Sequence, residues 1–399
     1  MLSYRDIAEA QERMRGIVHT TPLDFSRTFS NFANNEIYLK LENLQKTGSF
    51  KVRGSYNKIS SLKKEEIPHG VVAASAGNHA QGVAYASTMQ GIPCTIVMPL
   101  GAPLSKVQAT RDYGAHVELH GNSFDDALAH ALELKEQSGA TFVHAFDDEA
   151  IIAGQGTVGL EILEQLPDVD AIICPVGGGG LIAGIAAAVK EKKPSIQVYG
   201  VEASACPSMA MSLVEKNPIT VEADPTMADG IAVKKPGLHP FELVQKYVDD
   251  MFTVDELEIA RTMLMLLERN KLLVEGSGAV SLAALLYQKI SIKNKKVVPI
   301  ISGGNVDVSF ISRIIERGMV EAGRFMHVTT ILKDRPGNLE KILEVITERQ
   351  GNILDISLSH MGDKIYPSYA QLSLSIETRD QDHIEEILVA LRNKGYVTE

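Results

Sequence analysis

The chain has 399 residues, of which 45% are apolar and 22% charged, with 32 Gly and no Trp. This composition is typical of a globular protein of two or three domains, and it excludes disordered, collagen-like and coiled-coil chains. The formal net charge of −11, from 39 basic and 50 acidic residues, argues against a nucleic-acid partner.

Cysteine usage and the N-terminal segment predict a cytoplasmic protein. The cysteines form no C-x-x-C pair and no even set, and the N-terminal segment has no apolar signal core. The uncharged stretch 171–189 contains Pro175 and a run of four glycines, so we expect a strand, a loop and a helix start there, with no membrane span. The three cysteines are Cys94, Cys174 and Cys206.

From about residue 70, short β-branched runs alternate with longer helical patterns. Strands that are apolar on both faces indicate a mainly parallel sheet covered by helices, which is a doubly wound α/β architecture. The expected strands are 71–74, 94–98, 116–119, 142–146, 171–176, 197–202 and 296–301, and the helices between them include 78–89, 104–111, 124–137 and 181–190.

This rhythm is interrupted twice. The Pro-rich and Met-rich stretch 204–250 shows no clear period and predicts a long irregular excursion. After a polar hinge at 321–324, the order of elements changes to βαββα, which predicts a separate α+β module over 325–399. Its expected elements are the strands 325–332, 352–359 and 369–377 and the helices 338–349 and 383–394.

The first motif is the glycine-bounded turn 48–54, which presents Lys51. A lysine becomes a nucleophile when burial or a neighbouring cation lowers its pKa, and we expect Arg53 and the flanking apolar residues to do so. The alternative interpretation is a surface lysine at a turn.

Segment 74–82 is the second motif, and it follows an apolar strand and opens a helix. The free N–H groups of a helix start bind anions, and small residues let a carboxylate or phosphate approach the backbone. Ser75 or Asn78 as a plain helix cap remains an alternative.

A third motif, 175–184, again leads from strand to loop to helix. Four consecutive glycines are entropically costly and predict a phosphate cradle. Gly178, Gly180 and Ala183 with the later Glu202 also satisfy the dinucleotide-binding pattern, so an NAD-dependent oxidoreductase stays open at this point.

The fourth motif is the strand exit 300–306, where Ser302 stands beside two glycines and offers a hydroxyl to a ligand or to the next helix. The histidines His79, His120 and His144 show no metal-ligand spacing, and we expect no metal. A lysine, an anion site, a phosphate cradle and a partner for a ring nitrogen together suit pyridoxal phosphate. The dinucleotide hypothesis leaves Lys51 and Ser302 unexplained.

At these motifs the chain resembles the fold-type II pyridoxal-phosphate enzymes, and within them the threonine dehydratases (threonine ammonia-lyases). The segments 49–54, 75–79, 177–181 and 302–305 match in family order across residues 1–320. The resemblance implies a catalytic domain with the two-lobe fold of the tryptophan synthase β chain. In that fold a small lobe over about 40–140 is inserted into the large one.

The tail 325–399 resembles an ACT regulatory domain through its Asp-x-Pro-Gly turn. That resemblance implies a small-molecule effector, an allosteric enzyme and a homodimer or homotetramer. The effector, and whether the role is isoleucine biosynthesis or threonine catabolism, stay open. Expected effector residues are Asp334, Pro336, Gly337 and Asn338 in the tail, with Lys46, Thr47, Gln81 and Asn305 for a nucleotide.

By the same resemblance, Lys51 carries the cofactor covalently and removes the Cα proton of the substrate. Asn78 contacts the phenolic oxygen and Ser302 the pyridine nitrogen, while Phe50 and Gly230 border the ring. The phosphate is expected at Gly177, Gly178, Gly179, Gly180 and Leu181. The substrate carboxylate is expected at Ser75, Ala76, Gly77, Asn78 and His79.

The implied reaction converts L-threonine to 2-oxobutanoate and ammonia, with L-serine to pyruvate as a side activity. Serine racemase is an alternative, but racemases of that type carry a Ser where this chain has Ala76. Their divalent-metal site is half matched, with Glu202 present and Ser208 in place of an acid. A third hypothesis is a non-catalytic amino-acid sensor, in which the tail binds the ligand and the rest of the chain is a scaffold.

Overall fold

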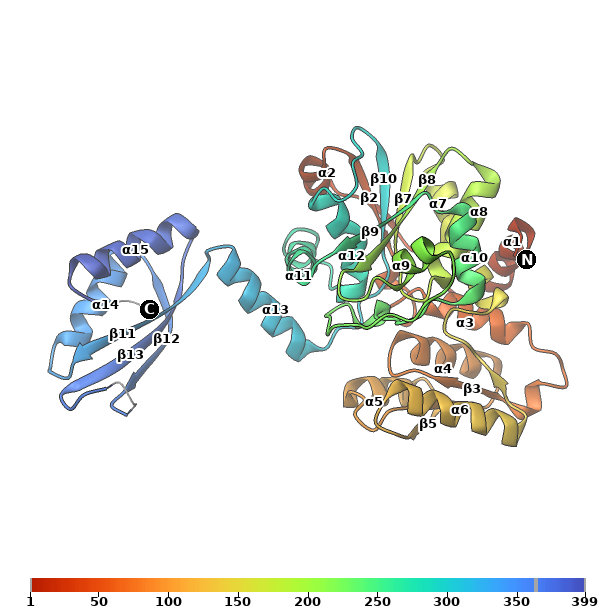
Figure 1. Cartoon of the computed structure of the whole chain (residues 1–399), viewed down its shortest axis with the longest axis horizontal. Coiled ribbons are helices and arrows are strands. Elements are labelled where there is room, and N and C mark those ends of the chain that lie inside the picture. Colours follow the sequence, from red (N-terminus) through yellow and green to blue (C-terminus); the bar gives the residue numbers. More distant parts are fainter. Residues whose placement is uncertain (1, 362–364, 398–399) are drawn as a thin grey trace. The chain divides into compact units, whose positions relative to one another are not determined.

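The computed structural model describes residues 2–361 and 365–397 of a chain that divides into two compact units, Met1–Asp307 and Val308–Glu399 (Figure 1). Each unit has its own hydrophobic core. The division precedes helix α13 (Val308–Glu321), whereas the sequence predicts it at the hinge 321–324. That helix therefore belongs with the second unit by its contacts.

The large lobe of the first unit is built on a six-stranded sheet in the order β1-β2-β10-β7-β8-β9. All neighbouring strands are parallel except β1 and β2. Alternate residues such as Ile172 and Cys174 pack with α7 (Glu149–Gln165) and α8 (Gly180–Lys192), and α12 (Gly276–Leu286) also packs on the sheet. The strands are β1 (Leu23–Phe25), β2 (Glu36–Leu41), β7 (Ala171–Pro175), β8 (Gln197–Ala203), β9 (Asp250–Val254) and β10 (Lys296–Ile301).

A four-stranded parallel sheet in the order β5-β4-β3-β6 forms the small lobe. Its last strand, β6, ends at Phe142, whereas the sequence predicts a strand over 142–146. His144 Nδ1 accepts the N–H groups of Phe146 and Asp147, and these bonds turn the chain. The strands are β3 (Val71–Ala74), β4 (Cys94–Met98), β5 (His116–Leu119) and β6 (Thr141–Phe142). Its helices are α4 (Asn78–Gln90), α5 (Leu104–Asp112) and α6 (Phe124–Ser138).

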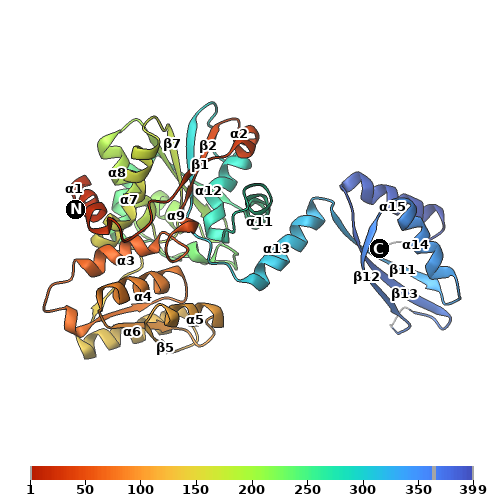
Figure 2. The same cartoon turned by 180° about the vertical axis from the view of Figure 1, so that it is seen from behind.

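Helix α3 (Lys51–Ser60) lies between the two lobes and packs against α4 on one side and α7 on the other (Figure 1, Figure 2). Close approach is possible because Gly54 of α3 meets Gly154 of α7, where an added Cβ would lie 2.6 Å from Gly54 Cα. The position of this helix matters for function because its first residue is Lys51.

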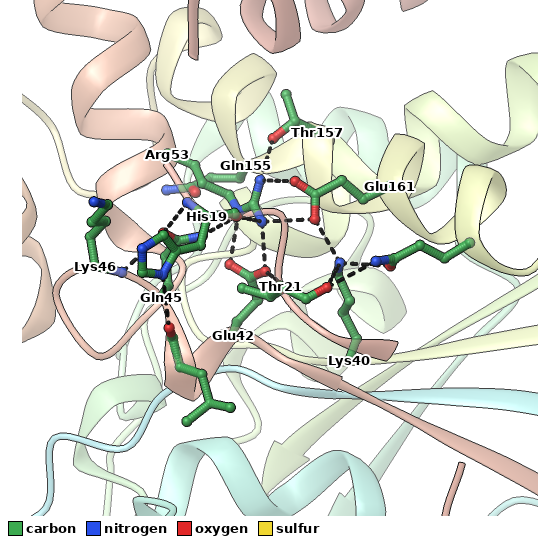
Figure 3. A network of polar contacts seen from close by, with 12 residues as sticks. His19, Thr21, Lys40, Glu42, Gln45, Lys46, Arg53, Gln155, Thr157 and Glu161 are labelled. Atoms are coloured by element: carbon green, nitrogen blue, oxygen red, sulfur yellow. Dashed lines mark hydrogen bonds and ion pairs between the residues drawn. The ribbon is translucent and has the colours of Figure 1, made fainter. Parts of the chain in front are cut away.

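Four buried charged side chains tie α3 to the large lobe, and we refer to Lys40, Glu42, Arg53 and Glu161 as the buried charge cluster (Figure 3). Arg53 Nη2 lies 2.7 Å from Glu42 Oε1, and Arg53 Nη1 lies 2.6 Å from Glu161 Oε1. Lys40 Nζ contacts Glu161 Oε2 at 2.6 Å. Two cations face two anions, so the cluster carries no net charge into the core.

The stretch 204–250, predicted as irregular, contains the helices α9 (Ser208–Glu215) and α10 (Leu238–Tyr247). Each helix start is capped by a carboxylate from another part of the chain. Glu202 accepts the N–H groups of Met209 and Ala210, and Asp147 accepts those of Leu238 and His239. Because these caps are not local, no N-cap signal stands beside α9 or α10 in the sequence. The other helices of this unit are α1 (Tyr4–Met14), α2 (Arg27–Ala33) and α11 (Glu256–Met265).

The second unit has the predicted βαββα order after α13. Its antiparallel sheet has the order β11-β13-β12. The core residues come from alternate strand positions, such as Val328 and Leu374, and from α14 and α15. The elements are β11 (Phe325–Lys333), α14 (Asn338–Glu348), β12 (Asn352–Ser359), β13 (Tyr369–Glu377) and α15 (Gln381–Asn393). No helix in the described parts of the chain has the length and apolar character needed to cross a bilayer.

Replacing Asp147 tests the long-range cap of α10. We expect Asp147→Ala to lower the free energy of unfolding by about 1–2 kcal/mol, because two N–H groups of the helix start lose their acceptor. Asp147→Asn, which keeps one oxygen acceptor, should lose less. Urea unfolding followed by circular dichroism measures both, and an alanine variant as stable as the wild type would contradict the capping role.

Candidate active site

Lys51 is the first residue of α3, half-buried at the junction of the lobes. Its Nζ donates a hydrogen bond to the Ala145 carbonyl oxygen at 3.1 Å. Burial lowers the pKa of the amine to about 8, while the negative charge of Glu275 acts in the opposite direction. A lysine with this pKa is partly neutral near physiological pH and is able to act as a nucleophile or base.

Arg53 does not activate Lys51 in the way that the sequence suggests. Its guanidinium lies between Glu42 and Glu161 in the buried charge cluster, so its charge is balanced there (Figure 3). The pKa of Lys51 is lowered by burial, with no contribution from Arg53. Of the two predicted causes, the apolar surroundings are confirmed and the neighbouring cation is wrong.

The helix start after β3 presents backbone N–H groups to the same region. Gly77 is the N-cap of α4 and has no side chain to cap the helix, so neither Ser75 nor Asn78 is the simple cap considered above. The N–H of Ser75 donates to Val97, and the Ser75 hydroxyl accepts the N–H of Gly77 at 3.2 Å. The first-turn N–H groups at Asn78 and His79 therefore remain for an anion.

The side chain of His79 points away from this anion site. It is buried, and Nε2 hydrogen-bonds the Val143 carbonyl oxygen at 2.9 Å. Burial lowers the pKa of the imidazole to about 3, so the ring is neutral and donates this bond. The ring of His79 is thus engaged within the protein, and the predicted contact of His79 with a substrate carboxylate is left to its backbone N–H.

The glycine loop after β7 leads directly into α8, as expected. Its glycines are required by close neighbours, because a Cβ on Gly178 would lie 2.3 Å from the Phe146 ring and one on Gly177 would lie 2.8 Å from Ile231 Cα. Gly179 is the N-cap of α8 and has a φ of 93°, a left-handed conformation that favours glycine. The α8 start, with Leu181 as its second residue, is thus a bare-backbone anion site.

Ser302 directly follows β10 and carries a hydroxyl that is poorly satisfied. Its Oγ reaches only the Ser277 carbonyl oxygen, at 3.4 Å, and the buried Ser277 Oγ has no hydrogen-bond partner. A Cβ on Gly230 would lie 2.8 Å from that Ser277 oxygen. The next helix starts only at residue 308, so Ser302 is not its cap. Phe50 is close as well, since its N–H donates to the Ser302 carbonyl oxygen at 3.2 Å.

Glu275 is a site residue that sequence reasoning missed. It is the N-cap of α12, yet its side chain does not cap that helix and instead accepts from Asn78 Nδ2 at 2.8 Å. A Cβ on Gly303 would lie only 2.4 Å from Glu275 Oε1. Burial raises the pKa of Glu275 to about 7. The sequence feature that could have indicated this residue is an isolated acidic residue before Gly-Ser-Gly at the start of an apolar helix.

Three of the four residues predicted for a nucleotide effector gather around Asn78. Asn305 Nδ2 donates to Asn78 Oδ1 and to the Thr47 carbonyl oxygen, both at 2.8 Å, and lies 3.4 Å from Gln81 Oε1. Lys46 contributes a backbone N–H that donates to Gln45. Asn78 Oδ1 accepts from Asn305 and Asn78 Nδ2 donates to Glu275, and these two bonds fix the orientation of the Asn78 amide.

The tail residues predicted for an effector lie in the turn between β11 and α14. Gly337 is the N-cap of α14 with a φ of 86°, and Asn338 Nδ2 donates to the Lys333 carbonyl oxygen at 2.8 Å. Asp334 pairs with His360 at 3.2 Å, and Pro336 stands between Arg335 and Gly337. The turn thus brings these four residues together.

The arrangement fits pyridoxal phosphate better than a dinucleotide. Glu202, the acid that an NAD site requires, is buried and fully engaged at the start of α9. The half-matched metal site is also occupied by protein contacts, since Ser208 Oγ donates to the Val233 carbonyl oxygen. Within the described residues no group of three potential ligands surrounds a metal position. The orphaned Ser277 hydroxyl and the two bare helix starts match a ligand with polar ring atoms and a phosphate.

A family model for pyridoxal-phosphate dependent enzymes matches residues 14–303. The chain belongs to this family. A second model, for the ACT domain, matches residues 326–399, so the tail is an ACT domain. The expected fold class and cofactor are thereby confirmed, and an NAD-dependent oxidoreductase is excluded.

One curated relative matches nearly the whole chain, and another matches about four fifths of it. An L-threonine ammonia-lyase of Thermotoga maritima is 52% identical over 396 residues, 99% of this chain and 98% of the relative. The L-threonine dehydratase catabolic TdcB of Escherichia coli is 50% identical over 319 residues, which cover 79% of this chain and 96% of that protein.

Solved structures cover the first unit. A processed threonine deaminase isoform 2 from Solanum lycopersicum has a TM-score of 0.76 at 39% identity and covers 79% of this chain and 87% of its own. A maize serine racemase has a TM-score of 0.76 at 37% identity and covers 80% of this chain and 98% of its own.

Glu275→Gln tests the buried carboxylate through the pH dependence of stability. Folding raises the pKa from 4.5 to about 7, so the folded chain binds more protons between these values and stability falls as pH rises. The charged groups that bear on Glu275 are Asp229, Lys106 and Lys51. Glutamine keeps an acceptor for Asn78 but cannot ionise. We therefore expect the variant to gain up to about 3 kcal/mol over the wild type above pH ~7.

Urea unfolding of both proteins between pH ~4.5 and pH ~8 measures this difference, which should vanish at the acid end. A constant difference across the range would show that Glu275 does not titrate as described.

Proposed function

We propose that the protein is an L-threonine ammonia-lyase that dehydrates and deaminates L-threonine to 2-oxobutanoate and ammonia, with pyruvate from L-serine as a side product. The observation that carries this proposal is Lys51, a half-buried lysine with a lowered pKa that lies with two helix N-termini and Ser302 in one site. Relatives named for threonine deamination, at 46–52% identity over nearly the whole chain, support the substrate.

Bound pyridoxal phosphate supplies an aldehyde that condenses with amines and an electron-withdrawing ring that acidifies the substrate Cα–H bond. Lys51 would be the amine that holds the cofactor, and its Nζ would take the Cα proton of the substrate. A pKa of about 8 suits this role, because a useful fraction of the amine is neutral at physiological pH. The glycine loop Gly177 to Gly180 and the start of α8 hold the phosphate.

The start of α4 orients the substrate. Its N–H groups at Asn78 and His79, with the Ser75 hydroxyl, bind the carboxylate, and the small residues Ala76 and Gly77 allow that approach. The bonds to Asn305 and Glu275 hold the Asn78 amide in place, and we assign this amide to the phenolic oxygen of the cofactor. These contacts place the Cα–H bond, since orientation contributes much of the rate in such sites.

Ser302 supports elimination over competing reactions. A neutral hydroxyl beside the pyridine nitrogen leaves that nitrogen unprotonated, whereas a carboxylate would hold a proton there. A less electron-withdrawing ring would favour loss of the β-hydroxyl over competing reactions. We place Phe50 and Gly230 beside the ring, because the Phe50 N–H bonds Ser302 and Gly230 lies against the Ser277 hydroxyl.

Serine racemase is a second candidate because the maize enzyme of that name shares this fold at 37% identity. The residue before Gly77 discriminates between the two, because a racemase of that type needs a serine acid/base there and this chain has Ala76. With L-serine as substrate, we expect pyruvate and no appreciable D-serine.

The ACT domain makes the enzyme responsive to a small effector, which we place at the turn from Asp334 to Asn338. ACT pairing favours a homodimer or homotetramer. The free buried cysteines Cys94, Cys174 and Cys206 agree with a cytoplasmic enzyme of amino-acid metabolism.

Lys51→Ala should lower turnover of L-threonine by at least about 10³-fold, because the residue both holds the cofactor and moves the proton. Lys58→Ala, which removes a lysine from the same helix α3, is the matched control and should stay active. A spectrophotometric assay for 2-oxobutanoate measures both. Borohydride treatment of the wild type should fix the cofactor on Lys51, and fixation on another lysine would contradict the assignment.

Ending the chain at residue 324 should leave turnover intact and abolish any response to isoleucine, valine or AMP. The first unit has its own cores, and the Escherichia coli relative is almost fully covered without an ACT domain. Turnover with and without each effector, for the full and shortened chains, measures the effect. An effector response that survives the truncation would place the regulatory site in the first unit.

A further inference from the structure

Lys51 and Arg53 leave opposite sides of α3. Residues two positions apart in an α-helix are separated by about 200° around the helix axis, so the side chains of Lys51 and Arg53 point in nearly opposite directions. Lys51 Nζ donates to the Ala145 carbonyl oxygen. Arg53 points into the large lobe, where it bonds Glu161 (Figure 3). A rotation of α3 that moves one side chain must therefore move the other.

The guanidinium of Arg53 is held on every side. Nε donates to Glu42 Oε2 at 2.8 Å, and Nη1 donates to Glu161 Oε1 at 2.6 Å and to Thr157 Oγ1 at 3.3 Å. Nη2 donates to the other oxygen of each carboxylate, at 2.7 and 3.0 Å, and to the His19 carbonyl oxygen at 3.3 Å. Its five N–H groups thus all have acceptors, in the planar fork geometry that only arginine offers.

These acceptors come from separate parts of the large lobe. Glu42 follows β2, and Glu161 and Thr157 lie on α7 (Figure 3). His19 lies between α1 and β1, and its carbonyl oxygen also accepts from Gln45 Nε2 at 2.7 Å. The start of α3 is also held by packing against α4 and α7, by the Phe50 N–H bond to Ser302 and by the Gly54 N–H bond to Gln155 Oε1 at 3.3 Å. Its N-cap Phe50 has no polar side-chain atom, however, so Arg53, with six hydrogen bonds, is the main polar side-chain anchor of the first turn.

We propose that Arg53 is a positioning residue for Lys51, which fixes the rotation of α3 and thereby the place of Lys51 Nζ in the active site. The inference rests on the proposed role of Lys51. The action is mechanical, since the buried charge cluster is neutral as a whole and Arg53 does not contribute to the pKa of Lys51. A displacement of the amine of about 1 Å is enough to cost about 10²-fold in rate.

The test compares Arg53→Lys with Lys40→Met in the full-length holoenzyme. Both residues are fully buried in the same cluster and bind Glu161, but Lys40 lies on β2 and donates its hydrogen bonds to Thr21, Glu161 and Gln165, none of which belongs to α3. Arg53→Lys keeps the charge and loses the fork. We expect it to lower kcat by about 10²-fold with KM within about twofold, while Lys40→Met keeps kcat within about twofold.

A second measurement does not need the reaction. In the cofactor-free proteins, amide hydrogen exchange over residues 51–55 should quicken in Arg53→Lys and stay near the wild-type rate in Lys40→Met. If Arg53→Lys does not fold, Glu42→Gln, which removes one half of the fork contact, should show the same pattern to a smaller degree. The thermal midpoint of each variant is recorded alongside.

Two outcomes would overturn the proposal. One is a loss of kcat that follows the loss of thermal midpoint equally in both variants, which indicates a structural role alone. The other is unchanged exchange over 51–55 in Arg53→Lys. A wild-type enzyme that forms no 2-oxobutanoate would refute the proposed function, and the exchange comparison would still decide whether Arg53 anchors the start of α3.

Discussion

A guanidinium buried between two carboxylates is the interaction on which the catalytic unit depends. Arg53 alone would be too costly to bury, and Glu42 and Glu161 alone would repel each other, so each charge in the core requires the others. The pairs join β2, α3 and α7, which are distant in the chain. A hydrophobic contact would hold these elements together, but directional bonds also fix their rotation.

The active site is assembled where this frame leaves polar groups unsatisfied. The starts of α4 and α8 carry no side-chain caps, and the Ser277 hydroxyl is buried without a partner. Such features destabilise a folded chain unless a ligand completes them. The glycines around them are required by close neighbours and keep Cβ atoms out of the space that a cofactor needs.

Much of the site could be predicted because its parts are local in the chain. Lys51, Asn78 and the four glycines lie where a turn or strand leads into a helix, and Ser302 directly follows a strand, so each motif can be recognised from a few neighbouring residues. Glu275 could not be predicted, because its partner Asn78 is 197 residues away. Helix α10 was missed for the same reason, since its cap is Asp147.

The alternation of strands and helices, the βαββα order of the tail and the four motifs follow from the sequence, because periodicity and turn chemistry act over a few residues. Only the folded chain shows that Arg53 is neutralised by Glu42 and Glu161 and that burial, with no help from that cation, lowers the pKa of Lys51. Burial and charge pairing depend on residues that are far apart in sequence, so they are decided by tertiary packing.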